Sequence, residues 1–172
     1  MFEANLKECF LRMQSGDKEA FTIIYNELKL PVFTVVSRIL QSKDLAEDVM
    51  QEVFVKLYTA PPDSSVRNLR AWIFQISRNL AIDALRKKRC VDVDEVELVA
   101  EDPTDGLLTQ MDMEAAIRRL PRTEREIISL HINAQLHFRE ISTILGLSLP
   151  ATYRRYRKAI QTLQEYLEEG AV

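Results

Sequence analysis

The sequence predicts an all-α protein of two small helical domains joined by an acidic linker, the second domain containing a helix-turn-helix. Two observations predict this fold, within a composition (4 Gly and 6 Pro in 172 residues) that excludes collagen-like and low-complexity chains. Apolar residues recur at helical spacing, and no segment alternates convincingly as a β-strand would. Charge also divides the chain, because residues 67–89 and 150–160 are strongly basic whereas residues 90–115 hold nine acidic residues and no basic one. We therefore place the linker at residues 90–110.

Several helices are predicted in residues 1–89, the first expected domain. Asp17 can cap one helix, and Pro31 suits the first turn of the next. A further helix begins near Ser42 and stops before a Pro-Pro pair, and Asn68 opens another. The expected inward-facing positions are Phe21, Ile24, Tyr25, Leu28, Val32, Val35, Val36, Ile39, Leu45, Ala46, Val49, Val53, Phe54, Leu57, Leu69, Trp72, Ile73, Ile76, Leu80 and Ala84.

Three shorter helices and a last, long helix are expected in the second domain, residues 111–172. Pro121 ends the first, and the segment Thr123-Glu124-Arg125-Glu126 predicts a capping box at the start of the second. Gly146 suits the left-handed turn that closes the third helix, and Ser148 caps the last. The expected inward-facing positions are Ile127, Ile128, Leu130, Ile141, Ile144, Leu145, Leu149, Thr152 or Tyr153, Tyr156, Ile160, Leu163 and Leu167.

The last two helices follow the helix-turn-helix pattern of a short helix, a Gly-containing turn and a second helix that carries arginines. The basic residues of the second helix lie on the half away from its apolar positions, where side chains can reach a DNA major groove. They are Arg154, Arg155, Arg157 and Lys158. A solvated helix face without DNA binding is the alternative.

Several classes of protein are disfavoured. The longest stretch without Asp, Glu, Lys or Arg, from Ile141 to Tyr153, is shorter than the roughly 18 residues that a membrane span needs. The N-terminus lacks the pattern of a signal peptide, so a cytoplasmic protein is expected. Cys9 is expected to be buried and Cys90 to be a linker thiol, with metal or redox sensing as a minor alternative. No motif of an enzyme or a cofactor site is present, so neither is expected.

Three blocks of sequence resemble the bacterial extracytoplasmic-function (ECF) sigma factors of the sigma-70 family. They are SKDLAEDVMQEVFVKLY, then NLRAWIFQISRNLAIDALRKKR, then LPRTEREIISL followed by FREISTILGLSLPATYRRYRKAI. The resemblance implies that residues 1–89 form sigma region 2, which binds RNA polymerase core and recognises and melts the −10 promoter element. It implies that residues 111–172 form region 4, which recognises the −35 element. An anti-sigma factor is a further expected partner.

The resemblance implies three sets of contact residues. On the third expected helix, a polar face beside the apolar stripe would bind the polymerase: Asp44, Asp48, Gln51, Glu52 and Val55. The −10 element would be bound by Ser64, Ser65, Asn68, Arg78, Asn79, Arg86, Lys87, Lys88 and Arg89. The −35 element would be bound by Tyr153, Arg154, Arg155, Arg157 and Lys158.

Each set has a chemical rationale and an alternative. Carboxylates suit an arginine-rich partner, although the same face could simply be solvated. Basic side chains follow phosphates, and Asn can bind a base edge. The loop before Asn68 has no aromatic residue, so hydroxyl and amide groups would have to bind an extruded base. Trp72 could stack on a base, but its spacing from Ile73 and Ile76 favours the core.

Two other functions remain open at this stage. A conventional helix-turn-helix regulator would bind palindromic duplex DNA as an isolated protein. A sigma-like adaptor would titrate an anti-sigma factor without entering the polymerase. The basic end of the fourth expected helix and the basic last helix disfavour the adaptor, because a decoy has no need of them.

Overall fold

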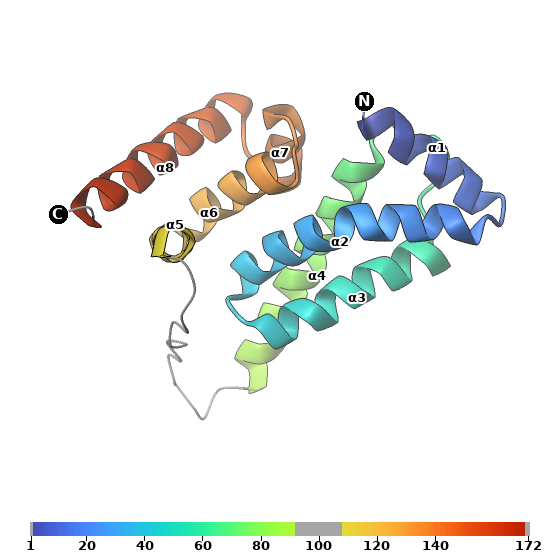
Figure 1. Ribbon diagram of the computed structural model, residues 1–172, viewed down its shortest axis with the longest axis horizontal. Coiled ribbons are helices and arrows are strands. Elements are labelled where there is room, and N and C mark those ends of the chain that lie inside the picture. Colours follow the sequence, from blue (N-terminus) through green and yellow to red (C-terminus); the bar gives the residue numbers. More distant parts are fainter. Residues whose placement is uncertain (1, 92–107, 171–172) are drawn as a thin grey trace.

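The computed structural model describes residues 2–91 and 108–170, and within these ranges the regular structure is entirely helical (Figure 1). The all-α prediction is therefore confirmed. In chain order the elements are α1 (Phe2–Gln14), α2 (Lys18–Leu40), α3 (Lys43–Thr59), α4 (Leu69–Val91), α5 (Leu108–Arg119), α6 (Arg122–Ile128), the π-helical turn η2 (Ser129–Asn133), α7 (Phe138–Leu145) and α8 (Leu149–Gly170). Most of the expected linker lies outside the described residues, and its first and last few residues continue α4 and begin α5.

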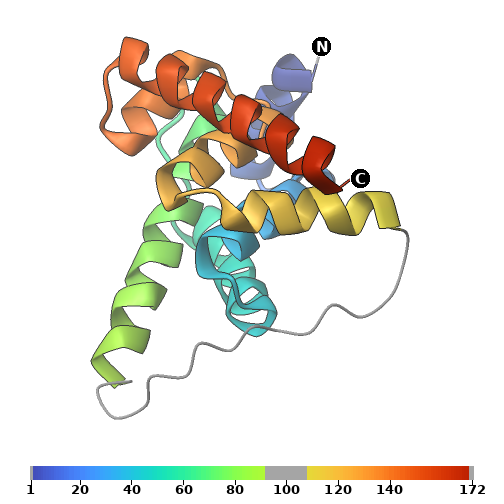
Figure 2. The same cartoon turned by 90° about the vertical axis from the view of Figure 1, so that its left-hand side faces the viewer.

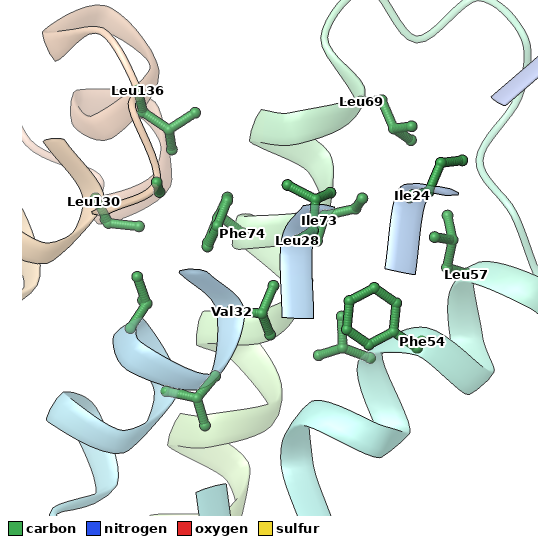
Figure 3. Close-up of a cluster of buried hydrophobic side chains, with 14 of the residues drawn as sticks. Ile24, Leu28, Val32, Phe54, Leu57, Leu69, Ile73, Phe74, Leu130 and Leu136 are labelled. Atoms are coloured by element: carbon green, nitrogen blue, oxygen red, sulfur yellow. The ribbon is translucent and has the colours of Figure 1, made fainter. Parts of the chain in front are cut away.

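Helix α2 is the centre of the first half, where it packs against α1, α3 and α4. Its apolar stripe explains this position, because Ile24, Leu28 and Val32 are fully buried. Figure 3 shows these side chains in one buried cluster with Phe54 of α3 and Ile73 of α4. Full burial of one such side chain stabilises the fold by about 1.5–3 kcal/mol, so the stripe holds the four helices together.

The start of α2 follows the prediction, whereas its middle does not. Asp17 caps the helix, accepting hydrogen bonds from the backbone N–H of Glu19 at 2.9 Å and of Ala20 at 3.3 Å. Pro31, expected to begin a new helix, lies inside α2 instead. A proline inside a helix costs about 3 kcal/mol, but the buried stripe continues from Leu28 to Val32 across it. Burial of that stripe on both sides keeps the helix continuous.

Arg12 ties the end of α1 to the beginning of α2. Its guanidinium donates hydrogen bonds to Asp17 at 2.9 and 2.7 Å. The hydrogen bond from Arg12 lowers the pKa of Asp17, and the capped backbone N–H groups lower it further. Helix α1 was not predicted from the sequence, although its buried Leu6, Phe10 and Met13 are spaced like a helix face. Cys9 is only 2% exposed in this helix, which confirms the prediction of a buried cysteine.

The second half is built around α8, which packs against α5, α6 and α7. The predicted helix-turn-helix is present, with one inward-facing position predicted wrongly. Gly146 closes α7 with a φ of +65°, and Ser148 Oγ accepts a hydrogen bond from the backbone N–H of Ala151 at 3.2 Å. Thr152 is fully buried and accepts a hydrogen bond from Ser142 of α7 at 2.9 Å. Leu149, expected to face inward, is 41% exposed, because Thr152 takes the inward position of this turn.

The predicted capping box at Thr123 and Glu126 is wrong. Helix α6 begins at Arg122 after Pro121, and no side chain caps it. Glu126 is 3% exposed and pairs with Arg78 of α4 at 2.6 Å and with Arg122 at 2.8 Å. Glu126 therefore makes charge-assisted hydrogen bonds to Arg78 of another helix and to Arg122 of its own helix. These are stronger than a bond to one backbone N–H, so the carboxylate does not cap the helix.

The two halves share one hydrophobic core. Leu130, Leu136 and Ile141 of the second half belong to the same buried cluster as Phe74 of α4 and Val32 of α2. Figure 3 shows Leu130 and Leu136 on the side of Phe74. A smaller cluster lies within the second half alone: Ala116, Ile117, Leu120, Ile128, Ala159 and Leu163. In the parts of the chain that the structure describes, no helix is long and apolar enough to cross a membrane.

Candidate nucleic-acid and partner interface

The five residues expected to bind the polymerase share one face of α3. Asp44, Asp48, Gln51, Glu52 and Val55 are all exposed, and the buried residues of this helix lie on its other side. Val55 is an apolar side chain that is 58% exposed within an otherwise polar face. The only ion pair at this face among the described residues joins Glu52 to Lys56 at 3.8 Å. The face therefore offers carboxylates around one exposed apolar side chain.

The loop between α3 and α4 is organised by Asp63. Its carboxylate accepts hydrogen bonds from the backbone N–H of Ser65 at 3.0 Å and from the hydroxyl of Ser64 at 3.3 Å. The backbone hydrogen bond from Ser65 is the main reason why the pKa of Asp63 is lowered. Ser64 and Ser65 are exposed, so their remaining hydrogen-bonding capacity faces solvent.

Asn68 has two roles in this structure. Its Oδ1 accepts a hydrogen bond from the backbone N–H of Ala71 at 2.9 Å, which confirms that Asn68 opens α4. Its Nδ2 donates to the carboxylate of Glu140 in α7. The side chain expected to bind a base is therefore bonded to the second half of the chain.

The other expected −10 residues divide into two groups along α4. Asn79 and the four basic residues 86–89 are exposed, and Figure 2 shows the end of α4 extending away from the second half. Arg78, by contrast, is 21% exposed in its side chain and pairs with the buried Glu126. Trp72 is half-buried and packs against the core, in agreement with its expected core position. Cys90, expected in the linker, is an exposed thiol in the last turn of α4.

The expected −35 residues lie together on the outer face of α8. Arg154, Arg157 and Lys158 are exposed, and Tyr153 is 49% exposed with its ring against Phe138 of α7. Arg155 is also exposed, but its guanidinium binds a buried carboxylate of α6. Its Nη1 donates to Glu124 Oε1 of α6 at 2.9 Å, and the Glu124 side chain is only 7% exposed.

Arg38 connects α2 to the second half and was not singled out by the sequence. Its guanidinium donates to both carboxylate oxygens of Glu114 in α5, at 3.1 and 2.9 Å. It also donates to Asn133 at 2.5 Å and to Ser129 at 3.3 Å, both in η2. With a side chain only 11% exposed, Arg38 satisfies three partners in a largely desolvated position.

Carboxylates of the second half form most of the polar contacts that were not predicted from the sequence. Glu114, Glu124, Glu126 and Glu140 each bind an arginine or an asparagine of another element. A signal was present for two of them, because Glu124 and Glu126 directly precede the apolar Ile127 and Ile128 in a helix of seven residues. No group of three or more potential metal ligands occurs within residues 2–91 and 108–170.

Two family models match this chain. Residues 24–90 match Sigma-70 region 2, and residues 110–163 match Sigma-70 region 4. The ECF RNA polymerase sigma factor RpoE of Cereibacter sphaeroides is 30% identical over 133 residues, which cover 74% of this chain and 72% of that protein. The ECF sigma factor SigW of Bacillus subtilis is 24% identical over 185 residues, covering 97% of this chain and 99% of SigW.

Two solved structures are similar in fold. The sigma factor RpoE of Bartonella quintana, crystallised with the anti-sigma factor NepR, gives a TM-score of 0.71 at 28% identity and covers 86% of this chain and 96% of that one. CnrH, in complex with the cytosolic domain of CnrY, gives a TM-score of 0.70 at 22% identity and covers 96% and 98% of the two chains.

Proposed function

Because this chain belongs to the ECF RNA polymerase sigma factors, we propose a separate role for each of three surfaces. The α3 face binds the polymerase. The α4 surface (the end of α4 with the loop before it) and the α8 surface (the outer face of α8) bind the two promoter elements. The observation that carries this proposal is the presence of two separate basic surfaces, the end of α4 and the outer face of α8, in a chain whose α3 exposes a carboxylate-rich face. Two basic surfaces fit two DNA elements, and the acidic face fits a basic protein partner.

The α3 face binds RNA polymerase core. Asp44, Asp48 and Glu52 supply carboxylates for charge-assisted hydrogen bonds to basic side chains of the polymerase. Val55 supplies an apolar contact that becomes buried on binding. Partly exposed charges steer association and set its salt dependence, so core binding is expected to weaken as salt rises.

The α4 surface binds the −10 element. Its basic end follows the phosphates, whereas Asn79 and the exposed serines of the preceding loop contact bases of the separated strand. The α8 surface binds the −35 element in the major groove. Arg155 lies closer to the start of α8 than Lys158, so we assign Arg155 to base edges and Lys158 to phosphates.

An anti-sigma protein is the proposed regulatory partner. The support is the similarity to the Bartonella sigma factor, which is 28% identical over most of both chains and was crystallised with its anti-sigma factor. We place the protein in the cytoplasm, where the polymerase and the chromosome are. The chain positions DNA, and the chemistry of RNA synthesis belongs to the polymerase.

Run-off transcription tests the function directly. Purified bacterial core polymerase is mixed with the full chain and a library of genomic fragments, and transcripts are sequenced. We expect initiation from a subset of fragments that share two motifs spaced as −10 and −35 elements, and none with core alone. Absence of initiation, together with stable binding of the isolated chain to palindromic duplexes, would identify a conventional regulator instead.

A further inference from the structure

An apolar patch lies within the basic outer face of α8, at the start of this helix. Leu149 is the first residue of α8 and is 41% exposed. Tyr153, one turn further along, is 49% exposed, and Pro150 between them is exposed as well. These three residues form the apolar patch. A purely electrostatic contact between α8 and DNA phosphates gives Leu149 and Pro150 no role.

The patch is held in place by the helix-turn-helix that carries it. Ser148 Oγ accepts a hydrogen bond from the backbone N–H of Ala151 at 3.2 Å, which fixes the first turn of α8. Pro150 lies in that turn, where its missing N–H breaks no helical hydrogen bond. The ring of Tyr153 packs edge-on against Phe138 of α7, with 5.5 Å between the ring centroids. A ring that is already packed in this way loses little conformational freedom when a ligand binds.

The charges around the patch favour a nucleic acid as its ligand. Arg139 of α7 lines the same surface hollow as the patch, and Arg154 and Arg157 follow along α8. All three arginines are exposed, and none forms an ion pair with another residue of the described ranges. Glu140, the acidic residue of this hollow, is half-buried and accepts a hydrogen bond from the backbone N–H of His137 at 2.9 Å. Unpaired cations beside apolar side chains fit a ligand that carries phosphates next to apolar groups.

Thymine is the base that offers an apolar group in the DNA major groove. Its C5-methyl projects into the groove, whereas the other base edges present hydrogen-bond donors and acceptors. The N-terminal residues of a recognition helix are the ones that reach base edges. Leu149 and Tyr153 are four residues apart on α8, so their Cβ atoms lie about 5–6 Å apart on one face. This separation fits methyl groups on neighbouring base pairs, which are stacked about 3.4 Å apart.

We propose that Leu149, with Pro150 and the ring of Tyr153, reads thymine methyl groups in the −35 element. This inference rests on the proposed function of the α8 surface and adds a determinant of its sequence preference. Contacts of the arginines with phosphates are alike in every sequence. Cytosine in place of thymine lacks the methyl and presents an amino group that Leu149 cannot bond, so the patch discriminates between the two. The preferred −35 sequence should contain one thymine, or thymines in two neighbouring base pairs, facing the start of α8.

Replacement of thymine by uracil tests this contact directly, because uracil lacks only the C5-methyl. Holoenzyme is reconstituted from core polymerase and the full chain, and a preferred promoter is selected from a randomised −35 set. Each thymine of its −35 element is then replaced singly by uracil in synthetic duplexes. Initiation is measured on two competing templates that give transcripts of different length. We expect one replacement, or two in neighbouring base pairs, to reduce initiation about three- to fourfold, the effect of removing one buried methyl group.

Two substitutions of Leu149 and one control assign the effect to the patch. Leu149→Ala should bring the ratio of initiation on thymine and uracil templates below about 1.5. Leu149→Met keeps an apolar side chain of similar volume and should retain most of the wild-type ratio. The control is Leu30→Ala, the same substitution at a 68% exposed position of α2, and it should keep the wild-type ratio. Circular dichroism checks helical content, and the comparison of templates with wild-type protein needs no variant at all.

The outcomes separate this inference from the proposed function. If every uracil template works as well as its thymine counterpart, while replacement of the whole −35 element abolishes initiation, the inference is overturned and the function stands. A uracil effect that persists in Leu149→Ala assigns the methyl contact to other residues and overturns it too. If Leu149→Ala no longer pulls down core polymerase, the patch is a polymerase contact and the inference is wrong. Initiation that is indifferent to the whole −35 element would count against the proposed function of α8, and the inference would fall with it.

Discussion

Removal of Arg155 should destabilise the protein because Glu124 is left without its partner. Glu124 is buried at the base of the α8 surface, with 7% of its side chain exposed, and Arg155 binds it at 2.9 Å. The variant Arg155→Ala leaves an unpaired carboxylate in that position. Glu124→Gln keeps an oxygen that can accept the same hydrogen bond but removes the charge. In the double variant, Glu124→Gln should therefore restore part of the stability that Arg155→Ala removes.

The size of the effect follows from the burial of the two partners. A buried polar group that loses its hydrogen bond costs about 1–3 kcal/mol. Arg155 is 46% exposed in its side chain, so water can reach part of the space that it vacates. We therefore expect Arg155→Ala to lower the free energy of unfolding by about 1–1.5 kcal/mol, which corresponds to a fall in melting temperature of roughly 2–6 °C. A buried neutral amide is less costly than a buried carboxylate, so Glu124→Gln should recover part of this loss.

The measurement is urea unfolding followed by circular dichroism for wild type, both single variants and the double variant. Glu124→Gln is expected to leave wild type nearly unchanged or slightly less stable, but to stabilise the Arg155→Ala protein. The coupling free energy between the two positions should be on the order of 1 kcal/mol. Strictly additive effects would show that Arg155 does not support Glu124, and the ion pair would then have no energetic role.

Three further predictions follow from the surfaces and from the cap of α2. Reversal of Asp48 and Glu52 to Lys should abolish pull-down by core polymerase while circular dichroism stays unchanged; retained binding would remove α3 from the polymerase contact. On a randomised −35 promoter set, Arg155→Ala should cost roughly 1–3 kcal/mol mainly on preferred sequences, whereas Lys158→Ala should weaken initiation evenly and flatten the log-log salt slope by about one; parallel losses would contradict this division. Because the pKa of Asp17 is lowered in the folded state, its contribution is complete above its unfolded pKa of about 3.9 and is lost as pH falls through the folded pKa. Asp17→Asn should therefore flatten the acid limb of the stability curve, and an unchanged acid limb would contradict the role of the cap.

Elements whose signals are local were predictable from the sequence. Asn68 and Ser148 each cap the next helix through a bond to an N–H three residues later, and Gly146 needs only its own positive φ. Exposure of the α3 face and of the basic residues of α8 also followed from periodicity alone. Family resemblance added the functional assignments, which periodicity does not contain.

Features that depend on distant parts of the chain were not predictable in this way. Pro31 is tolerated inside α2 because helices far along the sequence bury the stripe around it. Glu126 fits a local capping box, but its partner Arg78 lies 48 residues away, and nothing in the local sequence shows that the two meet. The same limit applies to Arg38, whose partners in α5 and η2 are between 76 and 95 residues away. Single-sequence patterns do not encode such pairings.

The shared core has a consequence for the lifetime of the protein in a cell. Adjacent residues of α6 face different cores, because Ile127 belongs to the large shared cluster and Ile128 to the small cluster of the second half. Separation of the halves exposes Ile127, Leu130 and Leu136 and leaves a unit of about 60 residues with a small core, a size at which folded domains are only marginally stable. Proteases act on such partly unfolded states. A chain whose halves have separated, and which is not bound to a partner, should therefore be degraded faster than one whose halves are packed together.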